Sequence, residues 1–264
     1  MTVNYGPNRY DVVGSFLRPA KLKQAREDFS AGAIDAEALK AIEDECITDL
    51  IAKEKKAGLS FITDGEFRRA TWHLDFMWAF EGIGHSATED GLPFHDEAAK
   101  IDDTYLTGKV SLAGEHPFVE HFRFVQSFED ESTTAKLTIP APAQFIEQFI
   151  MPMNRKATDA AYESDALLED DIVAAYLAFI EQVHAAGCRN LQFDDCSWGC
   201  LVDPKAELFF GTDQAGLARI KETLLRVNNR VLDAAPADLC INTHVCRGNF
   251  HSTWACEGGY DDVA

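Results

Sequence analysis

The sequence lacks any run approaching the roughly 20 consecutive apolar residues that a transmembrane helix requires. Its first stretch, Met1 to Asn8, also lacks the charged and apolar regions of a signal peptide. Basic residues are scarce, since 24 Lys and Arg against 44 Asp and Glu give a formal net charge of -20. So acidic a chain is poorly suited to bind a nucleic-acid backbone or an anionic membrane surface. From these absences we expect a soluble cytoplasmic protein that binds small molecules. They do not decide whether the protein forms a homo-oligomer.

The sequence also lacks the even number of cysteines that is typical of a protein held together by disulfides. The seven cysteines are an odd count and, apart from Cys46, they lie in the second half of the chain. Without export signals, this pattern argues against a disulfide scaffold and favours reduced thiols that are free to bind metal. Apolar residues make up 46% of the 264 residues, which is enough for a large core. This size fits one α/β barrel or two ordinary domains.

Short apolar runs alternate with helical patterns along the chain. Strands are predicted at 10–13, 59–63, 135–139 and 189–193, with a fifth beginning at Leu239. Four helical regions are predicted. The first begins after Pro19, and the second runs from an N-cap at Asp35 to a terminal Gly58. The third covers 167–186 and ends at Gly187, and the fourth covers about 214–234. The aromatic stretch 71–84 fits a helix or a lid on apolar surface, and Pro140 to Pro142 ends the third strand.

The recurrence of strand and helix predicts a parallel α/β fold, specifically a (β/α)8 TIM-type barrel. The sequence provides about five of the eight βα units, so we expect an incomplete barrel without its C-terminal strands. We expect a single domain over 1–264 with an irregular insertion at about 85–130. Within the insertion, 105–110 and 122–125 are predicted to pair as a hairpin.

The fifth strand leads to His244 and Cys246, two residues apart. Side chains alternate along a strand, so both should point to the same side. An imidazole and a thiolate on one face are half of a tetrahedral zinc site. An H-x-C pattern on its own is more often structural, because free cysteine is usually buried.

Three other strand ends carry polar or small residues. Gly14 and Ser15 follow the first strand, Glu66 follows the second, and Asp194 follows the fourth. Functional groups of parallel α/β folds gather at these carboxyl ends. A turn at Gly14, or a surface ion pair between Glu66 and Arg68, is the alternative explanation.

These stretches together resemble the cobalamin-independent methionine synthase family, in its C-terminal catalytic barrel and its short single-barrel relatives. The matching segments are Val13-Gly14-Ser15-Phe16, Asp64-Gly65-Glu66-Phe67-Arg68-Arg69, Gln192-Phe193-Asp194-Asp195 and Thr243-His244-Val245-Cys246-Arg247-Gly248-Asn249-Phe250. The resemblance implies zinc-dependent methyl transfer from 5-methyltetrahydrofolate, usually polyglutamylated, to the thiol of homocysteine.

The resemblance also implies roles for single residues. His244 and Cys246 match zinc ligands, and Glu66 and Asp194 match the carboxylates that hold the substrate amino group. Gly14 and Ser15 match the part that receives the substrate carboxylate. Trp198 is placed beside the pterin, and no general acid is assigned. Asp195 stands where many family members have Glu.

One departure concerns the remaining zinc ligands. The family completes its site with a Glu and a Cys further along the barrel, which would fall after Ala264, and Cys256 is a substitute that no family pattern supports. Two alternatives therefore stay open: zinc-dependent alkyl transfer to or from another small thiol, and a truncated barrel that only binds ligands.

Overall fold

The computed structural model describes residues 11–88, 92–93, 98–99 and 101–263. The helices are α1 Ala20–Ser30, α2 Ala36–Lys56, α3 Leu74–Met77, α4 Pro117–Gln126, α5 Pro142–Ile150, α6 Arg155–Ala161, α7 Asp165–Ala185, α8 Ser197–Leu201, α9 Ala206–Phe210 and α10 Gln214–Ala234. The strands are β1 Phe61–Ile62, β2 Glu81–Ser86, β3 Leu92–Pro93, β4 Ala98–Ala99, β5 Asp103–Ser111, β6 Thr134–Ala135, β7 Leu137–Pro140, β8 Asn190–Asp195 and β9 Cys240–Val245.

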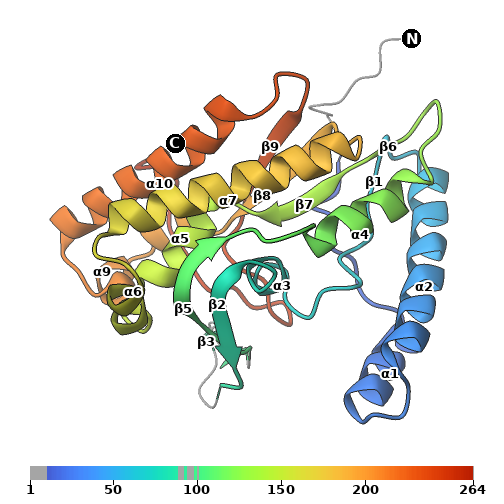
Figure 1. Ribbon diagram of the computed structural model, residues 1–264, viewed down its shortest axis with the longest axis horizontal. Coiled ribbons are helices and arrows are strands. Elements are labelled where there is room, and N and C mark those ends of the chain that lie inside the picture. Colours follow the sequence, from blue (N-terminus) through green and yellow to red (C-terminus); the bar gives the residue numbers. More distant parts are fainter. Residues whose placement is uncertain (1–10, 89–91, 94–97, 100, 264) are drawn as a thin grey trace.

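Parallel strands form the centre of the molecule (Figure 1). β1 pairs with β6, β7 pairs with β8, and β8 pairs with β9, all in parallel. Only Lys136 separates β6 from β7, so one continuous segment joins the two sheets. The prediction of a parallel α/β fold is confirmed. In the described part of the chain these strands form an open row rather than a closed barrel.

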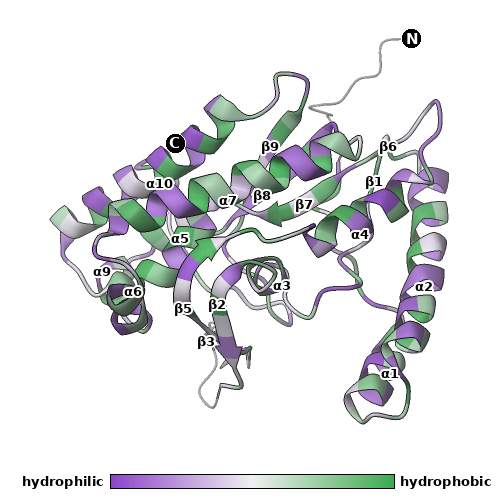
Figure 2. Ribbon diagram, in the orientation of Figure 1, coloured by the Kyte–Doolittle hydropathy of each residue, from purple (hydrophilic) through white to green (hydrophobic). Residues whose placement is uncertain are grey.

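The helices cover the strands as the hydrophobic periodicity predicts. Every residue of β7 and β8 is buried, which is typical of parallel strands covered on both faces. α7 and α10 contact each other, and α7 passes in front of β8 in Figure 1. Hydrophobic and hydrophilic stretches alternate along both helices in Figure 2, as expected for helices with one face on the core.

Several predicted helix boundaries are confirmed. Asp35 is the N-cap of α2, and its Oδ1 accepts a hydrogen bond of 2.8 Å from the backbone N–H of Ala38. Gly58 follows α2 with a φ of +83°, the left-handed conformation that favours glycine after a helix. α7 and α10 match their predicted ranges within two residues.

The predicted strand at 10–13 is wrong for the residues that the structure describes, 11–13; Tyr10 lies outside them. This segment forms no strand ladder. Two side chains donate hydrogen bonds to its carbonyl groups instead: Nζ of Lys136, between β6 and β7, donates to Val12 O, and Nε2 of Gln192 on β8 donates to Val13 O at 2.6 Å.

The predicted hairpin between 105–110 and 122–125 is also wrong. β5 contains 105–110 but pairs antiparallel with β2, and 122–125 lies within α4. α4 forms because Pro117 occupies its first turn and four apolar side chains recur at helical spacing, Phe118, Val119, Phe122 and Val125.

The core is rich in aromatic rings, and its centre is Phe76 of α3. Phe76 is fully buried, and its ring centroid lies 5.0 Å from that of Phe179 and 5.5 Å from those of Phe118 and Tyr176. The stretch 71–84 therefore contains a short helix that packs in the centre of the core.

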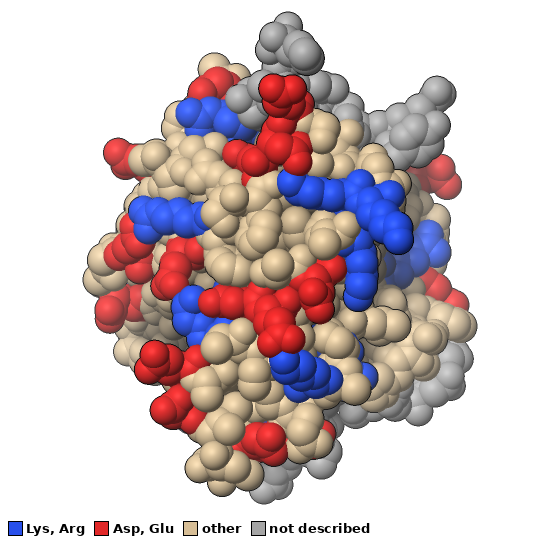
Figure 3. Space-filling view, turned by 90° about the vertical axis from the view of Figure 1, so that its right-hand side faces the viewer, with Lys and Arg blue, Asp and Glu red and all other residues tan. Residues whose placement is uncertain are grey.

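On the face shown in Figure 3, acidic and basic side chains are interspersed. No helix of the described residues has the length and apolarity needed to cross a bilayer.

Candidate active site

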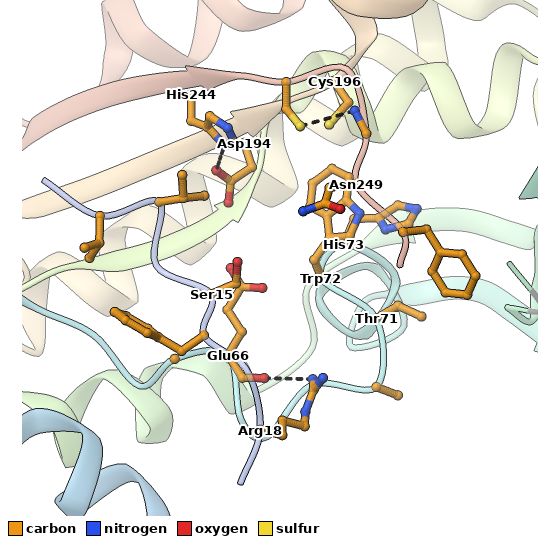
Figure 4. Close-up of a pocket in the computed structure, with 18 of the residues that line it drawn as sticks. Ser15, Arg18, Glu66, Thr71, Trp72, His73, Asp194, Cys196, His244 and Asn249 are labelled. Carbon is orange, nitrogen blue, oxygen red and sulfur yellow. Dashed lines mark hydrogen bonds and ion pairs between the residues drawn. The ribbon is translucent and has the colours of Figure 1, made fainter. Parts of the chain in front are cut away.

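A cavity of about 740 Å³ opens at the carboxyl ends of the central strands. Figure 4 shows side chains from segments far apart in sequence converging on it. Its lining comes from four segments of the chain, at 12–18, 65–73, 194–196 and 244–250, together with Ile101. Five of the predicted site residues line it: Ser15, Glu66, Asp194, His244 and Cys246.

Asp194 and His244 form an ion pair between adjacent strands. They are register partners on β8 and β9, so the sheet itself sets their separation. The Nδ1 of His244 lies 2.8 Å from Oδ1 of Asp194, which also accepts a hydrogen bond of 2.7 Å from Nε2 of Gln192. The hydrogen bonds to Asp194 and then to Cys246 raise the pKa of His244 to about 9.

Cys246 is surrounded by hydrogen-bond donors. The Cys196 thiol and the His244 imidazole are hydrogen-bonded to its sulfur, and the backbone N–H of Gly248 donates to Sγ at 3.2 Å. These donors, the Cys196 thiol first, lower the pKa of Cys246 to about 4 despite its partial burial. These contacts favour the thiolate form of Cys246, which is the form that binds metals.

Glu66 lies on a strained turn after β1. Its φ is +58°, a left-handed conformation that is uncommon for a residue other than glycine. Its backbone N–H donates to Oδ1 of Asp64 at 2.8 Å, and its Oε1 accepts a hydrogen bond of 3.0 Å from the Thr138 hydroxyl. Nη1 of Arg69 lies 3.5 Å from the same oxygen. Burial raises the pKa of Glu66, and the Arg69 charge opposes that rise.

Glu66 and Asp194 approach the same part of the cavity from different strands, and their carboxylates point toward one another in Figure 4. The negative charge of Asp194 contributes to the raised pKa of Glu66. Two carboxylates that share a site favour a cation between them. This part of the cavity is therefore suited to bind an ammonium group.

Ser15 lines the same cavity, and Gly14 directly precedes it. Gly14 has a φ of +121°, and a Cβ on it would lie 2.6 Å from Cγ2 of Thr138, so only glycine fits. Its carbonyl accepts a hydrogen bond of 3.0 Å from the Thr63 hydroxyl. Ser15 is exposed and lines the cavity, whereas Gly14 is buried and shapes the backbone.

The far wall of the cavity was not predicted from the sequence. Trp72 and His73 lie there with their ring centroids 4.4 Å apart, and Phe250 and Ile101 also line the cavity. Burial lowers the pKa of His73 to about 3, so this imidazole is neutral. The wall can accommodate a flat, uncharged group. The only signal for it in the sequence is the aromatic content of 71–84, which fits core packing equally well.

Arg18 and Cys196 are two further lining residues that sequence reasoning missed. Nη2 of Arg18 donates to the backbone carbonyl of Glu66 at 3.1 Å and thereby supports the strained turn. Cys196 directly follows β8, and its thiol is hydrogen-bonded to Cys246.

Trp198 does not line this cavity. It borders a separate hollow of about 250 Å³ with Val245, Tyr260 and Val263, and its Nε1 donates to Oδ2 of Asp195 at 2.7 Å. Asp195 is fully buried and also accepts a hydrogen bond of 2.8 Å from Nδ2 of Asn228. In this structure Asp195 and Trp198 therefore support β8 and α8 from behind the cavity.

The zinc prediction rests on the chemistry of His244 and Cys246. An imidazole whose Nδ1 is held by a carboxylate, beside a thiolate, is a donor arrangement typical of zinc sites. The two side chains fit zinc as a pair. Among the described residues, no group of three or more His, Cys, Asp or Glu side chains is arranged to hold a metal ion.

No family model matches the chain. It is 38% identical over 261 residues to the uncharacterized protein YxjH of Bacillus subtilis (strain 168), and 36% identical over 262 residues to YxjG of the same organism. Each alignment covers 98% of this chain and 66% of the relative. The chain thus spans about two thirds of the length of these curated relatives.

Solved structures extend the comparison. The crystal structure of the putative vitamin-B12-independent methionine synthase from Listeria monocytogenes matches with a TM-score of 0.73 and 31% identity, over 94% of this chain and 68% of that chain. A B12-independent methionine synthase from Shewanella sp. W3-18-1, in complex with selenomethionine, matches with a TM-score of 0.58 and 17% identity. That alignment covers 82% of this chain and 55% of the Shewanella chain, and at this identity it shows a shared fold only.

Proposed function

The chain belongs to the vitamin-B12-independent methionine synthase family, and from this premise we propose that it transfers a methyl group to the thiol of homocysteine. The proposed donor is a 5-methyltetrahydrofolate, and the proposed cofactor is zinc. The observation that carries the proposal is the meeting of Asp194, His244 and Cys246 at adjacent strand ends, with Glu66 in the same cavity.

The amino-acid end of homocysteine binds between the carboxylates and the glycine turn. Glu66 and Asp194 accept hydrogen bonds from the ammonium group, and its positive charge relieves the repulsion between them. The hydroxyl and backbone N–H of Ser15 receive the substrate carboxylate. These contacts fix the orientation of the substrate and direct its thiol toward β9.

His244 and Cys246 would hold the zinc ion. When bound, zinc keeps the substrate sulfur in its nucleophilic thiolate form at neutral pH, although a free thiol has a pKa of about 8.5. Asp194 orients the imidazole through Nδ1, which leaves Nε2 as the nitrogen for the metal. Asp194 thus serves both the metal ligand and the substrate ammonium.

The methyl donor occupies the far wall. Its flat ring system packs against Trp72 and Phe250, beside the neutral imidazole of His73. This placement differs from the position beside Trp198 that the family resemblance predicted. The transferred methyl group then lies between the ring and the substrate sulfur, and this alignment in a single cavity lowers the barrier to the reaction.

Metal analysis of purified variants tests the proposal. We expect the unmodified chain to bind zinc, and we expect His244→Ala and Cys246→Ala to lose that zinc. Cys240→Ala is the matched control, because Cys240 lies on the same strand but does not line the cavity. Methionine formation from homocysteine and 5-methyltetrahydrofolate is measured on the same samples. Unchanged zinc content in both site variants would refute the proposal.

A further inference from the structure

Four of the seven cysteines form two facing pairs. Cys196 and Cys200 lie four residues apart at α8, so both point to one face of that helix. Cys196 is hydrogen-bonded to Cys246, and the Sγ of Cys200 lies 3.3 Å from the Sγ of Cys256. All four are free thiols.

The backbone holds the second pair in place. Gly199 lies against the backbone where the segment 247–263 begins: a Cβ on it would lie 2.7 Å from the carbonyl oxygen of Cys246 and 3.5 Å from Cα of Arg247. The backbone N–H of Glu257 donates to Oδ2 of Asp203 at 2.8 Å, just beyond the end of α8. These contacts flank the Cys200–Cys256 pair on both sides and fix the approach of the two sulfur atoms.

We propose that Cys200 and Cys256 form a reversible disulfide that fastens the segment 247–263 to α8. Closing the bond requires the sulfur atoms to move together by about an ångström, to the length of ~2.05 Å. The two residues lie 56 positions apart, so the bond closes a long loop. The inference depends on neither zinc nor methyl transfer.

The oxidant is a small-molecule disulfide such as oxidised glutathione. The Cys256 thiol loses its proton to solvent, and its sulfur attacks one sulfur of the oxidant, which releases one small thiolate. Cys200 then loses its proton and attacks the Cys256 sulfur of the mixed disulfide, which releases the second small thiolate. Two protein thiols are oxidised, and one small disulfide is reduced to two thiols.

Glu147 is placed to take the proton from Cys200. The Ser197 hydroxyl donates to Oε2 of its carboxylate at 2.7 Å, and the nearby Cys200 thiol is one of the groups that lower the pKa of this carboxyl. The buried carboxylate has a pKa of about 7, raised by burial, so it can accept and return a proton near neutral pH. This carboxylate has no role in the proposed methyl transfer.

The disulfide would act on the cavity wall. Gly248, Asn249 and Phe250 line the cavity, and they lie between the end of β9 and Cys256. The bond would fasten this stretch to α8 at Cys256, in addition to its backbone connection to β9. The cavity would then keep the shape seen in the reduced structure.

The test uses the full chain in buffers of graded reduced-to-oxidised glutathione ratio, followed by alkylation and peptide mass spectrometry. We expect a Cys200–Cys256 peptide as the main crosslink, and an increase in Tm of about 5 °C or more upon oxidation. Cleavage by trypsin after Arg247 releases the fragment 248–264. On a non-reducing gel this fragment should stay attached to the rest of the protein only after oxidation.

Variants give the controls. Cys200→Ser and Cys256→Ser should each abolish the crosslink and the Tm increase, whereas Cys240→Ser should keep both. The proposal is overturned if the main crosslink joins Cys196 to Cys246, if no crosslink forms under any ratio, or if the crosslinked chain has the Tm of the reduced one. If a variant fails to fold, mapping the crosslinked peptides of the unmodified chain still shows which cysteines are joined.

Discussion

His244 and Asp194 are register partners on two adjacent parallel strands, and their side chains meet at 2.8 Å between Nδ1 and Oδ1. The position of the proposed metal ligand is thus set by the hydrogen-bond ladder of the sheet and by one carboxylate. Because that carboxylate also faces Glu66, it links the proposed metal site to the proposed ammonium site.

Asp194→Asn should weaken metal binding without abolishing it. The amide keeps the shape of the side chain but loses the charge that fixes the imidazole, and changes of this kind typically cost 10- to 100-fold in metal affinity. The measurement is zinc affinity by competition with a chromogenic chelator. Asp213→Asn, at the N-cap of α10 and outside the cavity, is the control. Equal zinc affinity in Asp194→Asn and the unmodified chain would contradict the proposed role.

Glu66→Gln should reduce homocysteine affinity by roughly 10- to 100-fold, because a charge-assisted hydrogen bond to the ammonium group is lost. The measurement is calorimetric titration with homocysteine and with 4-mercaptobutanoate, which has the thiol and the carboxylate but no amino group. The variant should bind the second ligand as the unmodified chain does. If both ligands lose affinity equally, Glu66 maintains the structure of the turn and does not recognise the amino group.

Trp72→Ala should lower the affinity for 5-methyltetrahydrofolate about tenfold, through loss of aromatic contact area, and leave homocysteine affinity unchanged. Trp198→Ala provides the comparison, because the family resemblance places that residue beside the donor and the structure places it behind the cavity. Fluorescence titration of both variants separates the two placements. A larger donor effect for Trp198→Ala than for Trp72→Ala would favour the placement predicted from the sequence.

Glu54 should make stability depend on pH. Burial raises its pKa to about 7, and its carboxylate contacts the backbone N–H and hydroxyl of Thr63. The folded state therefore holds a proton that the unfolded state releases at lower pH. The neutral carboxyl makes its full contribution to the free energy of unfolding below the unfolded pKa of about 4.5. This contribution is lost as the pH rises through 7.

Glu54→Gln mimics the neutral acid, so it should have nearly the same free energy of unfolding as the unmodified chain at about pH 4, below the unfolded pKa. Above pH 7 the variant should be more stable by about 1 kcal/mol or more, since one pKa unit corresponds to ~1.4 kcal/mol. Urea denaturation across this pH range measures the difference. A constant difference at every pH would show that ionisation of Glu54 is not the cause.

The sequence predicted the long helices and buried strands because their signals are local. α7 carries its apolar face and its terminal Gly187 within one stretch, and β8 is an apolar run that ends in carboxylates. The β2–β5 pair was missed because its pairing is not local. β2, Glu-Gly-Ile-Gly-His-Ser, has two glycines and little apolar character, so nothing in it marks a strand.

The candidate site divides in the same way. Ser15, Glu66, Asp194, His244 and Cys246 were expected together because parallel strand ends converge, and all five line one cavity. Their chemical roles stay predictions. The wall of Trp72 and His73 could not be predicted, because its position depends on how the chain turns after Glu66, where a non-glycine residue adopts positive φ.

The register of β9 against β8 decides whether a folded chain has the proposed metal site. If β9 slipped by one residue, His244 and Cys246 would turn away from the cavity, and Thr243 and Val245 would replace them. A slip of two residues would keep the face but separate His244 from Asp194. Such chains could still bury most of the same apolar surface and remain compact. Zinc binding would then report correct strand pairing more sensitively than helix content or compactness.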